Sequence, residues 1–399
     1  MNKEKIGIPK LRFPGFTGAW EQRKVSDIFT VTRGQVLATT KISEVKTNEM
    51  CFPVYSSQTK NNGLMGYYNK YLFNTAITWT TDGANAGTVN YREGKFYSTN
   101  VNGVLLSDDG YANRAIAEIL DRVAWRHVSR VGNPKLMNNV MSNIKISIPS
   151  SFEEQNAISE FLTKFDHLIA LHQRKLEHLK QQKNGLLQKM FPKSGESVPE
   201  VRFPGFTDSW EQRRLGEVAD SVEYGINAPA KEYDGINKYL RITDIDDTTH
   251  EFLQSDLTSP DTDLTLAEKF KLLEGDILFA RTGASVGKSY IYSREDGSVY
   301  YAGFLIRMRF NKSISPNFIF QNTLTTAYKQ YVEVTSQRSG QPGVNAKEYS
   351  NYSLYIPSKE EQQKIGSFFQ QLDTLIALYQ RKLEHLELLK KGLLQQMFV

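Results

Sequence analysis

Apolar residues recur at spacings of three and four along two long stretches of this chain, neither of which contains proline. This spacing places the apolar side chains on one face of a helix. Each stretch predicts a helix of about 36 residues, or roughly 54 Å at 1.5 Å per residue. The stripe residues expected to be buried are Ile158, Phe161, Leu176, Leu179 and Leu186 in the first helix, and Ile365, Phe368, Leu383, Leu386 and Leu393 in the second.

Both predicted helices open on the same polar signal, just after a proline. Residues 151–154 read Ser-Phe-Glu-Glu and residues 358–361 read Ser-Lys-Glu-Glu, which is the pattern of a capping box. A helix of this length with one apolar face is not stable alone in water. We therefore expect the two helices to pair as an antiparallel coiled coil; the alternative is that each packs on its own domain.

The chain repeats itself around these helices. QRKLEHL occurs at residues 173–179 and 380–386, and RFPGF followed by a tryptophan occurs near Leu11 and again near Val201. A tandem repeat of this kind predicts an α+β chain with two β-rich domains, each followed by a long helix. The expected parts are residues 1–150 (first domain), 151–191 (first helix), 192–200 (a linker rich in Pro, Gly and Ser), 201–357 (second domain) and 358–399 (second helix).

The two blocks between the repeated motifs are expected to be β-rich. Short runs of high β-propensity lie at residues 74–81 and 100–107 in the first block, and at 275–280, 289–293 and 302–310 in the second. Residues 112–126 predict a helix in the first block. Alignment of the blocks places WTTDGANAGTV (79–89) on FARTGASVGKS (279–289), and SRVGNP (129–134) on SQRSGQP (336–342).

These two aligned segments are the candidate sites for nucleic-acid binding. Arginine can bind the O6 and N7 edge of guanine, and asparagine or glutamine can bind adenine. The alternative is that glycine and proline only shape turns whose backbone groups the amides satisfy. The candidate DNA-binding residues are Thr81, Asn85, Arg130, Asn133, Lys135, Arg281, Ser285, Lys288, Arg338, Gln341 and Asn345.

Composition adds few constraints. The chain has 399 residues, of which 40% are hydrophobic, and its net charge of +5 is compatible with a polyanionic partner. No apolar run approaches the roughly twenty residues of a membrane span, and no secretory signal is recognisable at the N-terminus. One cysteine, Cys51, cannot form an internal disulfide. We therefore expect a soluble protein of the reducing cytoplasm.

Several catalytic signatures are incomplete. Residues 283–289 place three residues between their glycines, whereas a phosphate-binding loop has four. Residues 133–136 (NPKL) lack the second proline and the aromatic residue of the amino-methyltransferase tetrad. The six histidines show no metal-ligand spacing. We therefore expect no catalytic, metal or cofactor site in this chain.

The repeated RFPGF motifs, the two variable blocks and the two near-identical helices resemble the specificity subunit of a type I restriction-modification enzyme. The resemblance implies that each block is a target-recognition domain reading one half of a split, asymmetric site in double-stranded DNA. It implies that the helices form the spacer and dock two methyltransferase subunits, joined by restriction subunits. Methyl donor, ATP and magnesium would then belong to those partners.

Two alternatives remain at this stage. One is a stand-alone two-domain coiled-coil module that binds DNA or two protein ligands. The other, a nuclease or methyltransferase in its own right, is disfavoured by the incomplete motifs.

Overall fold

The computed structural model describes residues 7–57, 60–193, 195–337 and 340–399. The chain divides into two compact units, each described here by itself. Unit 1 comprises Met1–Leu171 with Leu383–Val399, and unit 2 comprises His172–Lys382. Each unit therefore contains one variable block and a part of both long helices. Among the described residues, no helix is both long enough and apolar enough to cross a membrane.

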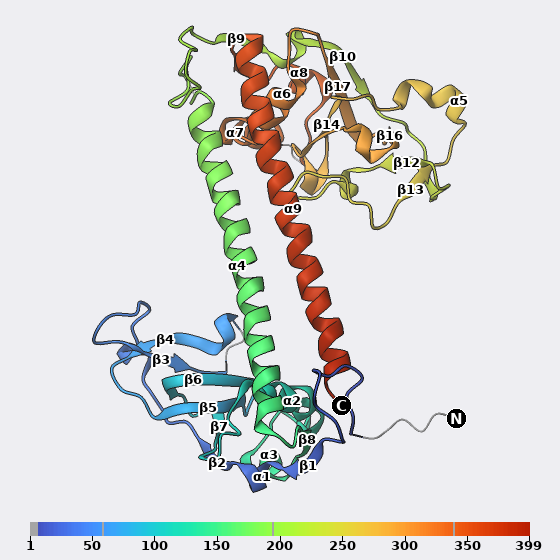
Figure 1. Ribbon diagram of the computed structural model, residues 1–399. Coiled ribbons are helices and arrows are strands. Elements are labelled where there is room, and N and C mark those ends of the chain that lie inside the picture. Colours follow the sequence, from blue (N-terminus) through green and yellow to red (C-terminus); the bar gives the residue numbers. More distant parts are fainter. Residues whose placement is uncertain (1–6, 58–59, 194, 338–339) are drawn as a thin grey trace. The chain divides into compact units, whose positions relative to one another are not determined.

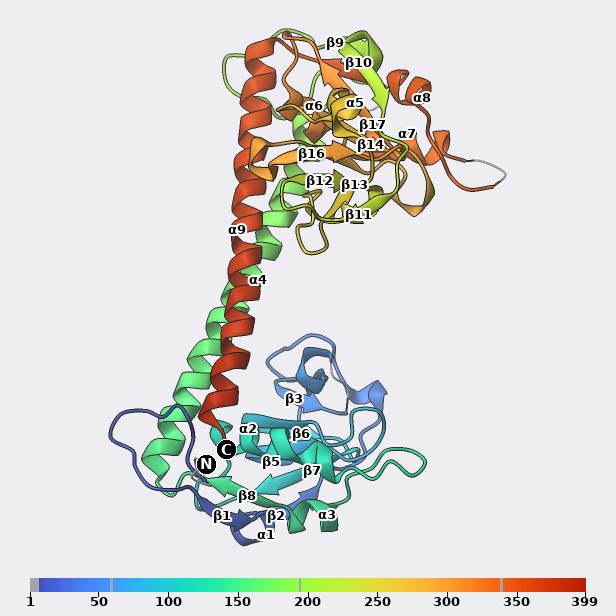
Figure 2. The same cartoon turned by 90° about the vertical axis from the view of Figure 1, so that its right-hand side faces the viewer.

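Unit 1 is built on a mixed six-stranded sheet with the order β2-β7-β5-β6-β3-β4. Helix α2 lies against β6, and its Ile116 and Leu120 share a core cluster with Ile77 and Trp79 of β5 (Figures 1 and 2). The strands are β2 (Thr30–Arg33), β3 (Phe52–Tyr55), β4 (Leu64–Tyr68), β5 (Phe73–Thr80), β6 (Val89–Ser98) and β7 (Asn102–Leu106); the helices are α1 (Val25–Ile28), α2 (Arg114–Ala124), α3 (Asn138–Asn143) and the 3-10 turns η1 (Thr39–Lys41), η2 (Lys60–Gly63) and η3 (Trp125–His127).

Unit 2 repeats the central part of this sheet. Its strands β10-β17-β14-β15 correspond in order to β2-β7-β5-β6, and two small two-stranded sheets are added, β11 with β13 and β12 with β16. Its strands are β10 (Ala219–Tyr224), β11 (Ala230–Glu232), β12 (Asn237–Leu240), β13 (Thr258–Pro260), β14 (Ile277–Ala280), β15 (Ser289–Ile291), β16 (Ser298–Tyr301) and β17 (Leu305–Phe310). Its helices are α5 (Leu264–Ala267), α6 (Pro316–Asn322), α7 (Thr326–Thr335), α8 (Ala346–Ser350) and the turns η4 (Leu215–Glu217), η5 (Ile242–Asp244), η6 (Glu268–Phe270), η7 (Gly283–Ser285) and η8 (Arg294–Asp296).

A short antiparallel strand pair closes each block at its two ends. In unit 1, β1 (Glu21–Lys24) pairs with β8 (Lys145–Ile148), and Glu21 lies opposite Ile148. In unit 2, β9 (Glu211–Arg214) pairs with β18 (Ser353–Ile356), and Glu211 lies opposite Ile356. The register is the same in both units. The α+β fold and the strands and helix expected from the sequence are confirmed.

The two long helices are α4 (Phe152–Met190) and α9 (Lys359–Met397), each of 39 residues. They exceed the expected length by about one turn because they continue almost to the repeated phenylalanine. The serine half of each predicted capping box is present, since Ser151 Oγ accepts the Glu154 N–H at 3.2 Å and Ser358 Oγ accepts the Glu361 N–H at 3.4 Å.

The glutamate of each box has another role, which also explains the RFPGF motif. Arg12 donates two hydrogen bonds to Glu154, at 2.6 and 2.7 Å. Arg202 binds Glu361 in the same way, at 2.9 and 2.7 Å. Both glutamates are about 1% exposed, so each buried carboxylate is paired bidentately as its desolvation requires. The motif thus fastens the start of each block to the first turn of its helix.

The far end of each helix packs on the tryptophan that follows an RFPGF motif. In unit 1, the ring of Phe398 meets Trp20 edge to face at 6.0 Å between centroids. In unit 2, Phe191 meets Trp210 in the same geometry at 6.3 Å. Unit 1 therefore contains the start of α4 and the end of α9, and unit 2 contains the start of α9 and the end of α4.

Within each unit the two helices run antiparallel. Asp166 of α4 and Lys390 of α9 form an ion pair at 2.7 Å in unit 1, and Lys183 of α4 pairs with Asp373 of α9 at 2.5 Å in unit 2. The ten stripe residues expected from the sequence are all buried or half-buried. Ile158 also joins the core of unit 1 and Ile365 that of unit 2, so packing on a block and packing between helices both occur. A coiled coil over the full helix length remains a prediction.

Candidate nucleic-acid interface

Two loops lie side by side at the end of the central sheet in each unit. We call residues 81–88 and 281–288 the glycine loops, and residues 129–135 and 336–343 the arginine loops. The glycine loops join β5 to β6 and β14 to β15. The arginine loops precede α3 and α8.

Backbone hydrogen bonds join the two loops of unit 1. The Gly83 N–H donates to the Pro134 carbonyl at 2.9 Å, and the Leu136 N–H donates to the Thr81 carbonyl at 2.8 Å. Because these backbone groups of the two segments satisfy one another, the loops form one continuous edge.

Unit 2 contains the same ladder. The Gly283 N–H donates to the Pro342 carbonyl at 3.1 Å, and the Val344 N–H donates to the Arg281 carbonyl at 2.9 Å. These are the partners that the sequence alignment of the two blocks places opposite one another. The alignment is therefore confirmed at the level of individual backbone groups.

The second glycine of each loop is required by packing. Gly87 and Gly287 have φ of 89° and 85°, a region that residues with a Cβ rarely adopt. A Cβ on Gly87 would fall 2.8 Å from Val128, and one on Gly287 would fall 2.5 Å from Val332. Around Gly83, in contrast, a Cβ would meet no described atom within 4 Å. The first glycine of the unit 1 loop thus borders open space.

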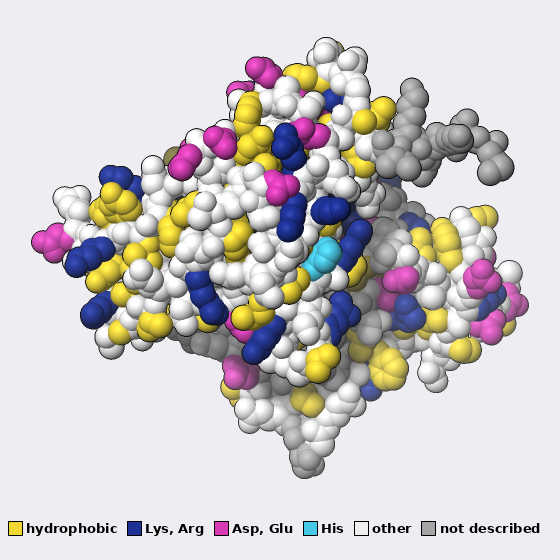
Figure 3. Space-filling model, turned by 90° about the horizontal axis from the view of Figure 1, so that it is seen from below, with side chains coloured by type: hydrophobic (Ala, Val, Ile, Leu, Met, Phe, Trp, Pro, Cys, Tyr) yellow, Lys and Arg dark blue, Asp and Glu magenta, His cyan; other side chains and the backbone are white. Residues whose placement is uncertain are grey.

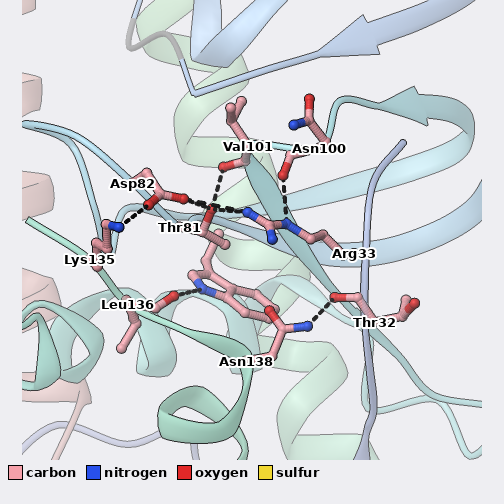
Figure 4. A network of polar contacts seen from close by, with 10 residues as sticks. Thr32, Arg33, Thr81, Asp82, Asn100, Val101, Lys135, Leu136 and Asn138 are labelled. Carbon is pink, nitrogen blue, oxygen red and sulfur yellow. Dashed lines mark hydrogen bonds and ion pairs between the residues drawn. The ribbon is translucent and has the colours of Figure 1, made fainter. Parts of the chain in front are cut away.

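A network of polar side chains fixes an arginine beside the loops of unit 1 (Figure 4). Arg33, the last residue of β2, donates from Nε to the Asn100 carbonyl at 2.6 Å and from Nη2 to Thr81 Oγ1 at 3.4 Å. The carboxylate of Asp82 lies 3.5 Å from Nη2 of Arg33 and 3.9 Å from the ammonium of Lys135. Two cations and one carboxylate therefore share this edge.

Two further contacts tie the residues directly after the arginine loop of unit 1 to the sheet. The indole N–H of Trp79 donates to the Leu136 carbonyl at 3.0 Å, and Asn138 Nδ2 donates to the Thr32 carbonyl at 3.2 Å (Figure 4). Trp79 is 1% exposed. The exposed polar residues of the arginine loop therefore adjoin a segment that is anchored to a buried tryptophan.

In unit 2 the arginine comes from the loop itself. The Arg281 guanidinium lies 4.9 Å from the ring centroid of Tyr224, the last residue of β10, and Nη1 of Arg281 lies 3.5 Å from the Gly303 carbonyl. An open hollow of about 570 Å³ adjoins this pair, with Phe304 and Arg241 also in its wall. Phe304 is 59% exposed, so the hollow has both an apolar and a cationic surface.

Five of the candidate residues have side chains that face solvent at least in part. Arg130, Asn133 and Gln341 are exposed, and Asn85 and Ser285 are half-buried. Arg338 lies outside the described residues. The five described positions lie in the paired loops.

Four other candidates are already engaged within their own unit. The Thr81 hydroxyl donates to the Val101 carbonyl at 3.0 Å, and Lys288 donates to the Ile245 carbonyl at 2.9 Å and pairs with Asp247. The Asn345 side chain caps α8 by accepting the Glu348 N–H at 3.0 Å. Lys135 is exposed but lies in the ion pair with Asp82. Thr81, Lys288 and Asn345 thus shape the loops, whereas Lys135 still reaches solvent.

Sequence reasoning missed Arg33 and Tyr224. They end the edge strands β2 and β10, far from the loops in the chain, and reach the site only because those strands pair with β7 and β17. No local motif marks them.

Basic side chains also gather elsewhere on unit 1. Figure 3 looks onto the end of unit 1 that carries α1, α3, β1 and β8, and shows Lys and Arg side chains with a His across the middle of that face. Lys24 and Lys145 lie opposite one another in the β1·β8 pair. In the described part of the chain, no group of three or more His, Cys, Asp or Glu is placed to hold a metal ion.

Comparisons with known proteins agree with this architecture. The family model of the type I restriction modification DNA specificity domain matches residues 18–181 and 207–388. The chain is 28% identical over 353 residues to a putative type I specificity subunit of Mycoplasma pneumoniae, with 86% of each chain covered. It is 23% identical over 401 residues to the specificity subunit of the type I restriction enzyme MjaVIII of Methanocaldococcus jannaschii, covering 94% of this chain and 91% of that one.

A solved structure shows the same fold. The crystal structure of the S subunit of a type I restriction-modification system from M. genitalium matches with a TM-score of 0.69 at 17% identity, covering 98% of this chain and 99% of that one.

Proposed function

The chain belongs to the family of type I restriction-modification DNA specificity subunits, and from that premise we propose that each of its two units reads one half of a split DNA site. The bases are read by the side chains of the paired loops. Arg130, Asn133 and Lys135 serve unit 1, and Arg281, Arg338 and Gln341 serve unit 2.

The observation that carries this proposal is one backbone frame with two sets of side chains. Both units place a glycine loop against an arginine loop through matching hydrogen bonds. The side chains on that frame differ, as Thr81 and Asp82 in unit 1 against Arg281 and Thr282 in unit 2 show. Base edges are distinguished by the donors and acceptors presented to them. Two frames with different donors therefore suit an asymmetric site.

The repeated helices suit two identical partner subunits. Leu171 of α4 and Leu378 of α9 hold equivalent places in the repeat and are 51% and 54% exposed. Large apolar side chains exposed at matching positions support one kind of partner docking twice. We assign this role to two methyltransferase subunits, which the restriction subunits join. Methyl donor, ATP and magnesium are bound by those partners in this proposal.

A block graft tests the proposal. Residues 21–148 are replaced by residues 211–356, so that both junctions fall at strand pairs of equal register. The chain is assembled with its methyltransferase subunits, and the methylated sites of a host genome are mapped. Two copies of one block should turn the asymmetric site into a palindrome built from the unit 2 half-site. The proposal is wrong if the grafted complex still methylates the wild-type site.

A mobility-shift experiment separates the subunit roles. The chain is titrated onto DNA containing the mapped site, alone and with the methyltransferase subunit. Site-specific retardation that needs this chain and strengthens with the partner is the expected result. Equal binding of the site and of a scrambled duplex by the full assembly would contradict a recognition role.

A further inference from the structure

The strand registers assign Arg33 and Tyr224 to the same place in the two units. In unit 1, Arg33 and Trp79 lie on either side of Gly103 in β7. In unit 2, Tyr224 and Phe279 lie on either side of Ile306 in β17.

Trp79 and Phe279 are themselves equivalent, because each is followed by a glycine loop with the same hydrogen bonds. The residue at the end of the edge strand is thus an arginine in one unit and a tyrosine in the other. At the first loop position the order is reversed, with Thr81 in unit 1 and Arg281 in unit 2.

The two side chains of each pair are in contact, so both units place one guanidinium between the end of the edge strand and the start of the glycine loop. The Arg33 Nη2 lies 3.4 Å from Thr81 Oγ1, and the Arg281 guanidinium lies 4.9 Å from the centre of the Tyr224 ring. The cation is supplied by the strand in unit 1 and by the loop in unit 2.

Protein contacts orient the Arg33 guanidinium and leave part of it available. Nε binds the Asn100 carbonyl, and Nη2 lies near Thr81 and Asp82. Among the described residues, Nη1 has no hydrogen-bond partner, and the side chain is 44% exposed. A planar fork held on one side presents its remaining N–H groups in a fixed direction.

The carboxylate in contact with Arg33 favours a base over a phosphate at the guanidinium itself, although Lys135 leaves the edge as a whole with one net positive charge. Asp82 lies 3.5 Å from the guanidinium, and its negative charge repels a phosphate group. A guanine edge is neutral and offers two acceptors, O6 and N7, to an arginine. The carboxylate of Asp82 can in turn accept the N4 amino group of the cytosine paired with that guanine.

We infer that Arg33 is the counterpart of Arg281, and that each reads a guanine in the half-site of its own unit. This inference rests on the proposed function. It adds to the predicted site a residue of unit 1 that the alignment of the two blocks does not contain.

The test uses the full chain assembled with its methyltransferase subunits. Arg33→Ala should relax one guanine position of the unit 1 half-site, with a loss of discrimination of about 5- to 150-fold at that position. The other half-site and the gap between them should stay unchanged. Arg281→Ala should relax one position of the other half-site. Arg23→Ala, which removes an exposed arginine of β1, is the matched control.

Arg33→Lys separates a base contact from a phosphate contact. Lysine keeps the charge but replaces the planar fork by a single ammonium, so it should restore the guanine preference only in part. If binding instead weakens equally on all sequences and lysine restores it, Arg33 contacts phosphate and the inference is wrong. An unchanged half-site in Arg33→Ala also overturns it. Neither result affects the proposed function, which the block graft and the mobility shift test separately.

Moving the arginine provides a gain-of-function test. Arg33→Tyr alone should lose the guanine preference, and Arg33→Tyr combined with Thr81→Arg rebuilds the unit 2 arrangement in unit 1. The double variant should regain a guanine preference at that position. Failure of the double variant to regain it, in a complex that still methylates the other half-site specifically, contradicts the equivalence of the two arginines.

Discussion

The arginine of each RFPGF motif stabilises the fold through a buried carboxylate. Glu361 is 1% exposed, and its charge is compensated by Arg202. Arg202→Ala leaves that carboxylate buried and unpaired, so we expect unit 2 to lose about 3–5 kcal/mol of its free energy of unfolding. Hydrogen exchange of the first turns of α9, measured in increasing urea, reports the change.

Two controls define the cause. Arg213 pairs with Glu211 on the surface, where water screens the pair, so Arg213→Ala should leave the free energy of unfolding nearly unchanged. Replacing both partners, Arg202→Met with Glu361→Leu, should recover most of the lost stability because no buried charge remains. A double variant as unstable as Arg202→Ala would mean that the ion pair is not the source of the effect.

His250 gives unit 2 a dependence on pH. Its ring is largely buried, Nδ1 donates to the Ser289 carbonyl at 2.8 Å, and burial lowers the pKa of the imidazole, assisted by Lys183, Lys329 and Lys288. The unfolded chain takes up a proton near pH 6.5, whereas folded His250 resists it. Between those two pKa values the unfolded state binds more protons, so the free energy of unfolding of unit 2 should fall as pH falls.

His250→Asn tests this dependence. The residue has φ of 59°, which asparagine tolerates better than most residues, and its amide can donate to Ser289. Urea unfolding of the variant between pH 7 and pH 5 should show a flatter slope than wild type. His178→Asn, on the exposed face of α4, controls for the loss of a histidine. An unchanged slope in His250→Asn assigns the pH dependence to other groups.

The residues missed by sequence analysis share a physical reason. The glycine and arginine loops can be predicted from the sequence because tight turns favour Gly, Asn and Pro. Arg33 and Tyr224 reach the same site only through the register of three strands distant in the chain, and no local rule encodes a register. The role of Lys183 has no local signal for the same reason, since its partner Asp373 lies on another helix.

At the scale of elements, one ion pair occurs twice between the long helices. Lys183–Asp373 in unit 2 and Lys390–Asp166 in unit 1 join equivalent positions of the repeat. Burial lowers the pKa of Lys390, and Glu118 partly offsets this effect. The Lys183 side chain is 13% exposed, so both ion pairs are partly shielded from water. The apolar stripe determines which faces pack, and these pairs favour the antiparallel direction and the register.

A charge exchange tests the pair in unit 2. Lys183→Asp should destabilise unit 2 because two carboxylates then face each other, and adding Asp373→Lys should restore most of the loss. The coupling energy expected between two contacting residues is about 0.5–3 kcal/mol. Gln321 can accommodate the exchange: the hydrogen bond from its Nε2 to Asp373 at 2.7 Å is lost, but its Oε1, which has no partner among the described residues, can accept from the new lysine.

An exposed ion pair of α4 provides the control for this charge exchange. Lys164 and Glu160 of α4 form an exposed pair, and their exchange should leave the free energy of unfolding within about 0.5 kcal/mol. Thermal unfolding of the four variants of each cycle gives the coupling. A coupling near zero for Lys183 and Asp373 would show that the apolar stripe alone sets the register.

The helix boundaries show how far local signals reach. The Ser-x-x-Glu caps and the apolar stripe located both helix starts to within one residue, and the observed ends at Met190 and Met397 lie one residue before the repeated phenylalanine. The ion pairs of Glu154 and Glu361 with distant arginines were not predicted, because in a capping box that carboxylate accepts a hydrogen bond from the first residues of its own helix. A non-local arginine binds it instead.

At the scale of the whole molecule, two helices of equal length suggest a ruler for the gap between half-sites. The two units divide the chain between Leu171 and His172 in α4, and between Lys382 and Leu383 in α9. An insertion at these two points leaves both ion pairs and both variable blocks intact. A copy of the repeated Gln-Arg-Lys-Leu-Glu-His-Leu segment at each point adds seven residues in helical register.

We expect this insertion to lengthen each helix by about 10 Å at 1.5 Å per residue, which corresponds to about three base pairs at 3.4 Å each. If α4 and α9 pair along their full length, the two half-sites should keep their sequences while the gap between them grows by about three base pairs. Because three base pairs also turn the second half-site by about 100°, binding should be weaker than in wild type. Methylation mapping of the insertion variant measures both the half-sites and the gap. A variant that keeps methylating sites with the wild-type gap would show that the helices do not set the spacing. A longer gap with unchanged half-sites would show that the variable blocks determine the sequences read and that the helices determine the distance between them.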